Sequence, residues 1–468
     1  MALEAKEGHV RKVLIANRGE IAVRIARACR DAGLASVAVY PAPDQDAAHV
    51  QAADEAMPLA GSTPAQTYLD TDRVLRAAVA SGADAVHPGY GFLAESAGFA
   101  QAVLDAGLTW IGPPPAVIRR LGDKLSARQV ARRAGAPLLP GMAAPATDIA
   151  EVSAFARDNG FPLVIKTPTG GGGKSVAVVR STGDLARSYT RVMRSAVAAG
   201  GPAECLAERY LEHARHLEAQ CLADRYGDVV VVSTRDCSLQ RRHQKIVEEA
   251  PAPFLPVGLD ARLRTASRAI LREAGCMGAV TCEFLLGQDG TLAFLEANAR
   301  LSVAHPVSEE VAGLDLVRET FRMAEGEPLG YGDPDMRGHA LQFRVYAEDP
   351  RRAFAPARGT VRGWRPPSGP GVRVDPGAGP GTVIVPAFGT LLAKLIVTGA
   401  SRAEALQRAA RALHEFEVTG VPTSLPLFRS LVTDEAFAPP DPGRPFAVHI
   451  GWIEANRLPV RGPRWSPR

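Results

Sequence analysis

The sequence is poor in several features that mark particular classes of protein. It contains six cysteines and no C-x-x-C pair: Cys29, Cys205, Cys221, Cys237, Cys276 and Cys282. This pattern argues against a disulfide framework and predicts the reduced thiols of a cytoplasmic protein. No apolar run reaches transmembrane length, and the first ten residues lack the apolar core of a signal peptide, so neither a membrane span nor secretion is expected.

Charge is also nearly balanced, because the formal net charge is +4 over 468 residues. No basic block or tail is present, so the composition gives no indication of nucleic-acid binding. Lysine is scarce, with only seven among 54 basic residues. The lysines that remain in the middle of the chain are therefore good candidates for positions that need a compact ammonium group. These are Lys124, Lys166, Lys174 and Lys245.

Length and an apolar content of 46% predict two or three folded domains. Residues 10–122 alternate short strands with helical patterns, which predicts an N-terminal doubly wound α/β domain. Residues 123–328 predict a central domain with a strand, glycine loop and strand, whose lid spans about 136–205. Residues 337–445 are rich in proline, glycine and short strands and predict a β-rich α+β domain.

The run GGGGKS at 170–175 is similar to a phosphate-binding P-loop, but the match fails. Pro168 stands where the first glycine is required, and a strand rather than a helix follows. Two interpretations remain, a mobile lid over a nucleotide or a flexible surface hairpin. Gly89 to Ala94 match a dinucleotide fingerprint only loosely, because this stretch follows a later strand than that fold requires.

Two glutamates lie on strands that a short turn joins. Glu283 and Glu296 flank the turn at 287–290, so hairpin pairing brings them together, and Asn298 shares a strand face with Glu296. Two carboxylates and an amide oxygen suit Mg²⁺ bound with phosphates. Taken alone, an isolated pair of solvated edge carboxylates is the more common explanation.

Three long sequence segments favour the metal site over the solvated pair of carboxylates. They are LIANRGEIAVRI at 14–25, HPGYGFLAES at 87–96 and RDCSLQRRHQKIVEEAPAP at 235–253. Together they resemble the biotin carboxylase family, and the resemblance runs from about residue 10 to about residue 435. It implies an ATP-grasp ligase that uses ATP and Mg²⁺ or Mn²⁺ to make carboxyphosphate from bicarbonate and then carboxylates biotin. No biotin-attachment motif is present, so the biotin is expected on a separate carrier protein. The resemblance also implies a homodimer and a carboxyltransferase partner.

The resemblance implies roles for individual residues. The implied ATP contacts are Lys124, Lys166, Gly172, Gly173, Glu208, Arg209, Tyr210, Leu211, His216, Gln240 and His243. The implied metal ligands are Glu283, Glu296 and Asn298, and the implied catalytic cations are Lys245, Arg300 and Arg344. Tyr90, Gly91 and Val303 are implied, with these cations, to form the bicarbonate and biotin pocket.

The chain departs from the family mainly on the bicarbonate and biotin side. Ala304 replaces the glutamate that takes the bicarbonate proton, and Ser302 replaces a glutamine that helps to hold bicarbonate and biotin. Losing a general base typically costs on the order of 10²- to 10⁴-fold in rate. The remaining departures are Thr169, Ser175, Gln342 and Gly389, which stand where glycine, glycine, glutamate and aspartate are usual.

Three hypotheses therefore follow from the sequence. The first is a biotin carboxylase subunit that is slow or uses a substitute base, such as His305 or a water molecule. The second is an ATP-grasp ligase for another carboxylic acid, which needs no base because carboxylates are already ionised at neutral pH. The third, less favoured, is a non-catalytic ATP-binding subunit of a carboxylase complex.

Overall fold

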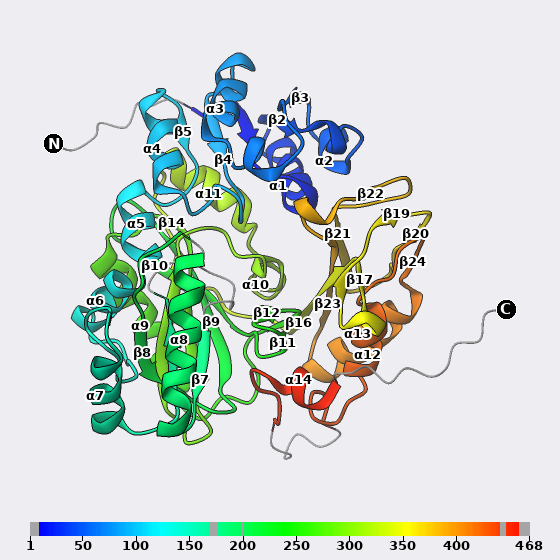
Figure 1. Ribbon diagram of the computed structural model, residues 1–468. Coiled ribbons are helices and arrows are strands. Elements are labelled where there is room, and N and C mark those ends of the chain that lie inside the picture. Colours follow the sequence, from blue (N-terminus) through cyan, green and yellow to red (C-terminus); the bar gives the residue numbers. More distant parts are fainter. Residues whose placement is uncertain (1–8, 168–175, 199, 440–445, 458–468) are drawn as a thin grey trace.

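The computed structural model describes residues 9–167, 176–198, 200–439 and 446–457 (Figure 1). Six positions singled out in the sequence, Pro168, Thr169, Gly172, Gly173, Lys174 and Ser175, lie outside the described residues. No described helix is both long and apolar enough to cross a membrane.

The N-terminal part is a five-stranded parallel sheet in the order β3-β2-β1-β4-β5. Its strands are β1 Lys12–Ile15, β2 Ala35–Tyr40, β3 Glu55–Pro58, β4 Ala85–His87 and β5 Thr109–Trp110. The covering helices are α1 Gly19–Asp31, α2 Ala48–Ala52, α3 Thr71–Ala80 and α4 Ala97–Asp105, with short 3₁₀ turns at Ala42–Asp44 and Pro64–Gln66. Helix α1 starts directly after β1, where Gly19 adopts a left-handed φ of 64°. This arrangement confirms the predicted α/β domain.

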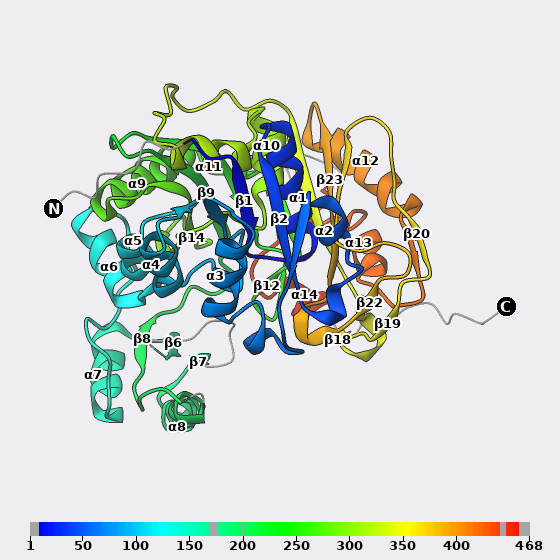
Figure 2. The same ribbon diagram turned by 90° about the horizontal axis from the view of Figure 1, so that it is seen from above.

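The segment predicted to be a lid, at about 136–205, forms a small unit with a sheet and a core of its own and is called the lid below. Its antiparallel sheet has the order β7-β6-β8, formed by Val176–Val179, Leu163–Lys166 and Leu206–Arg209. Helices α7 Ile149–Asn159 and α8 Thr182–Ala198 pack on it around Val152, Ile165 and Val192. Asp148 and Glu151 form a capping box that fixes the start of α7. The lid projects from the rest of the molecule in Figure 2.

One eight-stranded sheet runs through the central and C-terminal parts in the order β15-β14-β9-β10-β13-β16-β23-β21. Its strands are β9 Arg215–Ala223, β10 Val229–Asp236, β13 Val247–Ala250, β14 Gly278–Leu286, β15 Leu292–Asn298, β16 His339–Tyr346, β21 Val372–Pro376 and β23 Leu391–Gly399. The step from the central to the C-terminal part is the antiparallel pairing of β13 with β16. The sequence patterns indicate two separate strand-rich regions, so this continuity is a new finding.

Helices cover both regions of this sheet (Figure 1). They are α5 Pro115–Gly122, α6 Lys124–Arg133, α9 Leu259–Ala274, α10 His305–Ala312, α11 Leu316–Ala324, α12 Arg402–Glu415, α13 Leu425–Leu431 and α14 Trp452–Arg457. Short elements complete the fold: β11 Gln240–Arg241, β12 Gln244–Lys245, β17 Glu348–Asp349, β18 Ala355–Pro356, β19 Gly359–Thr360, β20 Gly363–Arg365, β22 Val383–Ile384, β24 Glu417–Thr419, and 3₁₀ turns at Pro350–Arg352 and Pro386–Phe388. The C-terminal part is β-rich with helices, as predicted.

Candidate active site

The two predicted phosphate lysines lie close together beside the lid. Lys124 begins α6 and its Nζ donates to the backbone oxygen of Thr167 at 3.3 Å, while Lys166 ends β6 and its Nζ lies 2.7 Å from Glu208 Oε2. Burial lowers the pKa of Lys124, and the neighbouring charge of Lys166 lowers it further. Two ammonium groups that disfavour each other in this way are suited to a polyanion such as a triphosphate.

The predicted adenine segment connects the lid to the body of the protein. Arg209 ends β8, and its backbone N–H donates to Pro140 O at 2.9 Å. The backbone N–H of Tyr210 donates to Pro162 O at 3.0 Å, and Leu211 follows. Loop segments that precede and follow α7 therefore hold both ends of this connection in place.

The predicted metal ligands come together as expected. Glu283 on β14 and Glu296 on β15 are register partners, and Asn298 Nδ2 donates to Glu283 Oε1 at 2.7 Å. Burial raises the pKa of Glu296, and the adjacent Glu283 carboxylate raises it further. In Glu283 burial has the same tendency, but Lys245 and His216 overcome it and lower the pKa to about 2.

Two further predicted residues, His216 and Gln240, form a chain of polar contacts that ends on Glu283. His216 on β9 has its Nε2 2.7 Å from Glu283 Oε2, and Gln240 lies 3.0 Å from the other ring nitrogen. Glu218, which the sequence interpretation missed, lies two residues further along β9 and shares the strand face of His216. His216, Glu218 and Glu283 each offer a ligand atom, and these atoms lie within 4.8 Å of one another. The strand period of two was the available signal for Glu218.

This donor set fits a divalent cation. Glu283 and Glu296 supply oxygen ligands, and the charge repulsion that raises the pKa of Glu296 is relieved by a bound cation. A bound Mg²⁺ would supply neutralisation of the phosphate charge. Here Glu283 and Glu296 would hold it, while Lys124 and Lys166 would orient the phosphates.

A hollow of 440 Å³ opens beside the carboxylates and is called the acceptor hollow below. Lys245 Nζ donates to Glu218 and, at 2.6 Å, to Glu283 Oε1. Burial opposes a charge on Lys245, but the two carboxylates overcome it and raise the pKa. The lining residues are Glu218, Arg242, His243, Gln244, Lys245, Glu283, Arg300, Ser302, Val303 and Arg344.

Two arginines complete the positive wall of the acceptor hollow. Arg300 donates from Nη2 to Asn298 Oδ1 at 2.9 Å, which connects the hollow to the predicted metal ligands. Arg344 on β16 donates from Nε to Glu248 Oε1 at 2.6 Å. Gln342, one of the departures, donates to Glu248 Oε2 at 3.0 Å and thereby shares the carboxylate that positions Arg344. Glu248 was not predicted.

The substituted segment lies at the start of α10. Ala304 is 1% exposed, and its backbone N–H donates to Ser302 Oγ at 3.1 Å. His305 is fully buried, its Nδ1 lies 2.7 Å from Ser302 O, and burial holds its pKa well below the usual range. It does not line the acceptor hollow. The structure therefore gives no support to His305 as a substitute base.

Tyr90 and Gly91 do not line the acceptor hollow. The Tyr90 hydroxyl donates to Glu20 at the start of α1, and Lys394 Nζ lies 5.6 Å from the ring centre. Gly389 ends the turn before β23 with a φ of 105°, and a side chain there would meet nothing within 4 Å. None of the three positions, Tyr90, Gly91 and Gly389, contributes a group to the hollow in this conformation.

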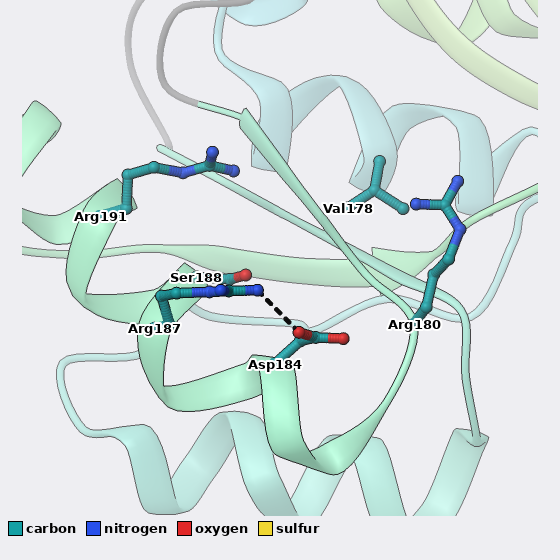
Figure 3. Close-up of a pocket in the computed structure, with 6 residues that line it drawn as sticks. All are labelled: Val178, Arg180, Asp184, Arg187, Ser188 and Arg191. Atoms are coloured by element: carbon teal, nitrogen blue, oxygen red, sulfur yellow. Dashed lines mark hydrogen bonds and ion pairs between the residues drawn. The ribbon is translucent and has the colours of Figure 1, made fainter.

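A separate hollow of 450 Å³ lies on the lid between β7 and α8 (Figure 3). Arg180, Arg187 and Arg191 border it, and Arg187 Nη2 lies 2.9 Å from Asp184 Oδ1. None of the predicted site residues lines it. It is therefore distinct from the ATP and acceptor sites.

Comparison with known proteins agrees with this geometry. Family models match residues 9–118 (biotin carboxylase, N-terminal domain), 123–331 (carbamoyl-phosphate synthase L chain, ATP binding domain) and 342–454 (biotin carboxylase C-terminal domain). The biotin-dependent acyl-coenzyme A carboxylase alpha3 subunit of Mycobacterium leprae is 53% identical over 96% of this chain and 75% of its own length. The chain belongs to the biotin carboxylase family.

Other biotin carboxylases are similar over nearly their whole length. That of Nostoc is 42% identical over 91% of this chain and 96% of its own. The structure of the biotin carboxylase domain dimer of Hydrogenobacter thermophilus 2-oxoglutarate carboxylase, solved with MgADP and bicarbonate, has a TM-score of 0.91 at 38% identity, covering 96% of this chain and 98% of that one. The chain is thus an ATP-grasp ligase of the biotin carboxylase family, whose members use ATP, Mg²⁺ and carrier-bound biotin.

Proposed function

We propose that this chain makes carboxyphosphate from bicarbonate and MgATP and carboxylates biotin on a separate carrier protein, at a rate limited by Ala304. The observation that supports this most is the acceptor hollow. It keeps Lys245, Arg300 and Arg344 next to the paired carboxylates, while position 304 offers only a buried methyl group. Three cations suit an oxyanion substrate, because charged donors make stronger hydrogen bonds to an oxyanion than neutral donors do.

The proposed role of each residue follows from its place. Lys124 and Lys166 hold phosphates, the segment Glu208–Leu211 borders the adenine, and His216, Gln240 and His243 make further contacts with the nucleotide. Glu283, Glu296 and Asn298 bind the metal, while Lys245 and Arg300 hold bicarbonate and Arg344 holds biotin. Tyr90, Gly91 and Val303 border biotin in this proposal, which requires Tyr90 to turn from Glu20.

The test is bicarbonate-dependent ADP release with free biotin, measured on the wild type and on the double reversion Ser302→Gln, Ala304→Glu. The wild type is expected to turn over slowly. The reversion is expected to be faster by roughly 10²- to 10⁴-fold, which is the usual contribution of a general base. Absence of bicarbonate-dependent turnover in the wild type at high enzyme concentration contradicts the proposal.

A second candidate is a ligase for another carboxylic acid. It is favoured by the short side chains of Ser302 and Ala304, because a bulkier acid needs room and no proton acceptor. Stimulation of ATP turnover by such an acid and not by bicarbonate would establish it. A chain that binds MgATP but turns it over with none of these acids would instead be a non-catalytic subunit.

We also propose domains at 10–122, 123–328 and 337–445, a homodimer, and assembly with a biotin carboxyl carrier protein and a carboxyltransferase. All six cysteines are free and buried, which agrees with a reducing cytoplasm. Light scattering tests the dimer, and a monomer under assay conditions contradicts it. Co-purification with a biotinylated partner from the source cell tests the assembly.

A further inference from the structure

The proposed function requires a proton acceptor that position 304 no longer supplies. Bicarbonate carries one proton, which must leave as its oxygen bonds to the γ-phosphorus. An acceptor must lie within reach of the substrate, so the residues lining the acceptor hollow are the ones to consider.

The carboxylates of the hollow are poor acceptors because they are already bonded to cations. Glu218 accepts from Lys245 and from Arg235, whose Nη2 lies 2.6 Å from Glu218 Oε2. Glu283 Oε1 accepts from Lys245 Nζ at 2.6 Å and from Asn298 Nδ2 at 2.7 Å. A carboxylate whose oxygens already accept hydrogen bonds from cationic and amide donors is a weak base.

The cations of the hollow cannot accept a proton either. Lys245 already donates to two carboxylates, and the ammonium of Lys245 and the guanidinium groups of Arg242, Arg300 and Arg344 are donors without an acceptor atom. Ser302 and Gln244 have no basic group. Of the described lining residues, this leaves His243.

His243 lines the acceptor hollow from a turn with an unusual backbone conformation. It lies in the tight turn between β11 and β12 with a left-handed φ of 66°, and Arg242 before it has a φ of 50°. Non-glycine residues adopt this conformation at a cost and do so mainly where the surroundings require it. The imidazole is exposed and makes no hydrogen bond or ion pair with any other described residue.

We propose that His243 accepts the bicarbonate proton in this chain, in place of the glutamate that its family has at position 304. The O–H bond of bicarbonate breaks and its proton passes to the unprotonated ring nitrogen. The freed oxygen bonds to the γ-phosphorus of ATP as the bond to the ADP oxygen breaks. The products are carboxyphosphate, ADP and an imidazolium, which returns its proton to water. This inference rests on the proposed function.

A double-mutant cycle separates this role from simple nucleotide contact. Four proteins are compared in bicarbonate-dependent ADP release with saturating MgATP and free biotin: wild type, His243→Asn, Ala304→Glu, and the two substitutions combined. We expect His243→Asn to lower kcat at least ~10-fold in the wild-type background and less than ~3-fold in the Ala304→Glu background, where the restored carboxylate supplies the base. Calorimetric titration with MgATP reports any loss of nucleotide affinity separately.

Two controls make the outcome specific. His414→Asn removes an exposed imidazole from α12 and is expected to change nothing. Glu95→Gln removes the half-exposed carboxylate that lies 3.5 Å from Arg300 Nε, and a loss confined to the wild-type background for this variant alone would assign the role to Glu95 and overturn the inference.

The remaining outcomes are equally decisive. Equal losses from His243→Asn in both backgrounds mean that His243 only contacts the nucleotide, so the inference fails while the proposed function stands. Wild-type activity that His243→Asn leaves unchanged also overturns the inference and leaves the proposed function standing. A wild type without bicarbonate-dependent turnover removes the proposed function and the inference together.

Discussion

Glu283 on β14 lies directly opposite Glu296 on β15, so two carboxylates are neighbours across an antiparallel hairpin. Burial and this proximity raise the pKa of Glu296, and no described residue donates a hydrogen bond to its side chain. A site of this kind is more stable when a divalent cation separates the two charges.

Glu296→Gln removes one of these charges and one metal ligand. We expect Mg²⁺-dependent ATP turnover to fall by on the order of 100-fold or more, because metal-assisted charge neutralisation contributes several kcal/mol to the transition state. Chelation of Mg²⁺ with EDTA should reduce the wild type to the level of the variant. Glu417→Gln, at an exposed carboxylate paired with Arg365, is the matched control. Full Mg²⁺-dependent turnover in Glu296→Gln would show that the metal is bound elsewhere.

Arg235→Met tests the charged centre beneath the acceptor hollow. Arg235 is 0% exposed and donates to Glu218 Oε2 at 2.8 and 2.6 Å and to Gln220 Oε1 at 2.9 Å. Removal of the Arg235 guanidinium leaves buried acceptors unpaired. We therefore expect the free energy of unfolding, measured with urea, to fall by about 3–5 kcal/mol. Arg191→Met on the exposed face of α8 should change stability by less than about 0.5 kcal/mol. Equal stability of the two variants would contradict the proposed importance of this centre.

Glu20→Gln tests a pH effect on stability. Burial raises the pKa of Glu20 to about 7 from 4.5, although Lys394 partly opposes this. The unfolded chain therefore loses this proton at a lower pH than the folded protein, and the stability that Glu20 contributes below pH 4.5 declines as the pH rises through 7. Glu20→Gln carries no ionisable group at this position and does not show this decline. Its free energy of unfolding relative to wild type should therefore rise by up to about 3 kcal/mol between roughly pH 4.5 and pH 8.

The measurement is urea unfolding of both proteins across that pH range. Glu325→Gln, at a partly exposed carboxylate beside His9, serves as a comparison. A difference between Glu20→Gln and wild type that stays constant with pH would mean that Glu20 is ionised throughout.

Much of the fold could be predicted because the relevant information is local. Alternation of strand and helix patterns near the N-terminus was enough for the parallel sheet, and a short turn was enough to place Glu283 opposite Glu296. Glu218 and Glu248 were not predicted, because both lie on strands that are buried along their whole length and a strand period of two does not by itself mark one polar residue as part of a site. Their importance depends on Lys245, Arg235 and Arg344, which approach from other strands.

The pairing of β13 with β16 could not be predicted for a related reason. It joins Val247 with Phe343, and no local pattern indicates a contact between residues so far apart in the chain. The exposed turn that holds His243 was visible only as part of the family string. Its left-handed backbone and exposed imidazole required coordinates.

The shared sheet has a mechanical consequence. Backbone hydrogen bonds run without a break from the strand of Glu283 through β9, β10 and β13 to the strand of Arg344. The spacing between the carboxylates of Glu283 and Glu296 and the guanidinium of Arg344 is therefore fixed by one continuous sheet. It does not depend on how tightly neighbouring units pack. The three strands of the lid belong to a different sheet, so displacement of the lid leaves this spacing unchanged.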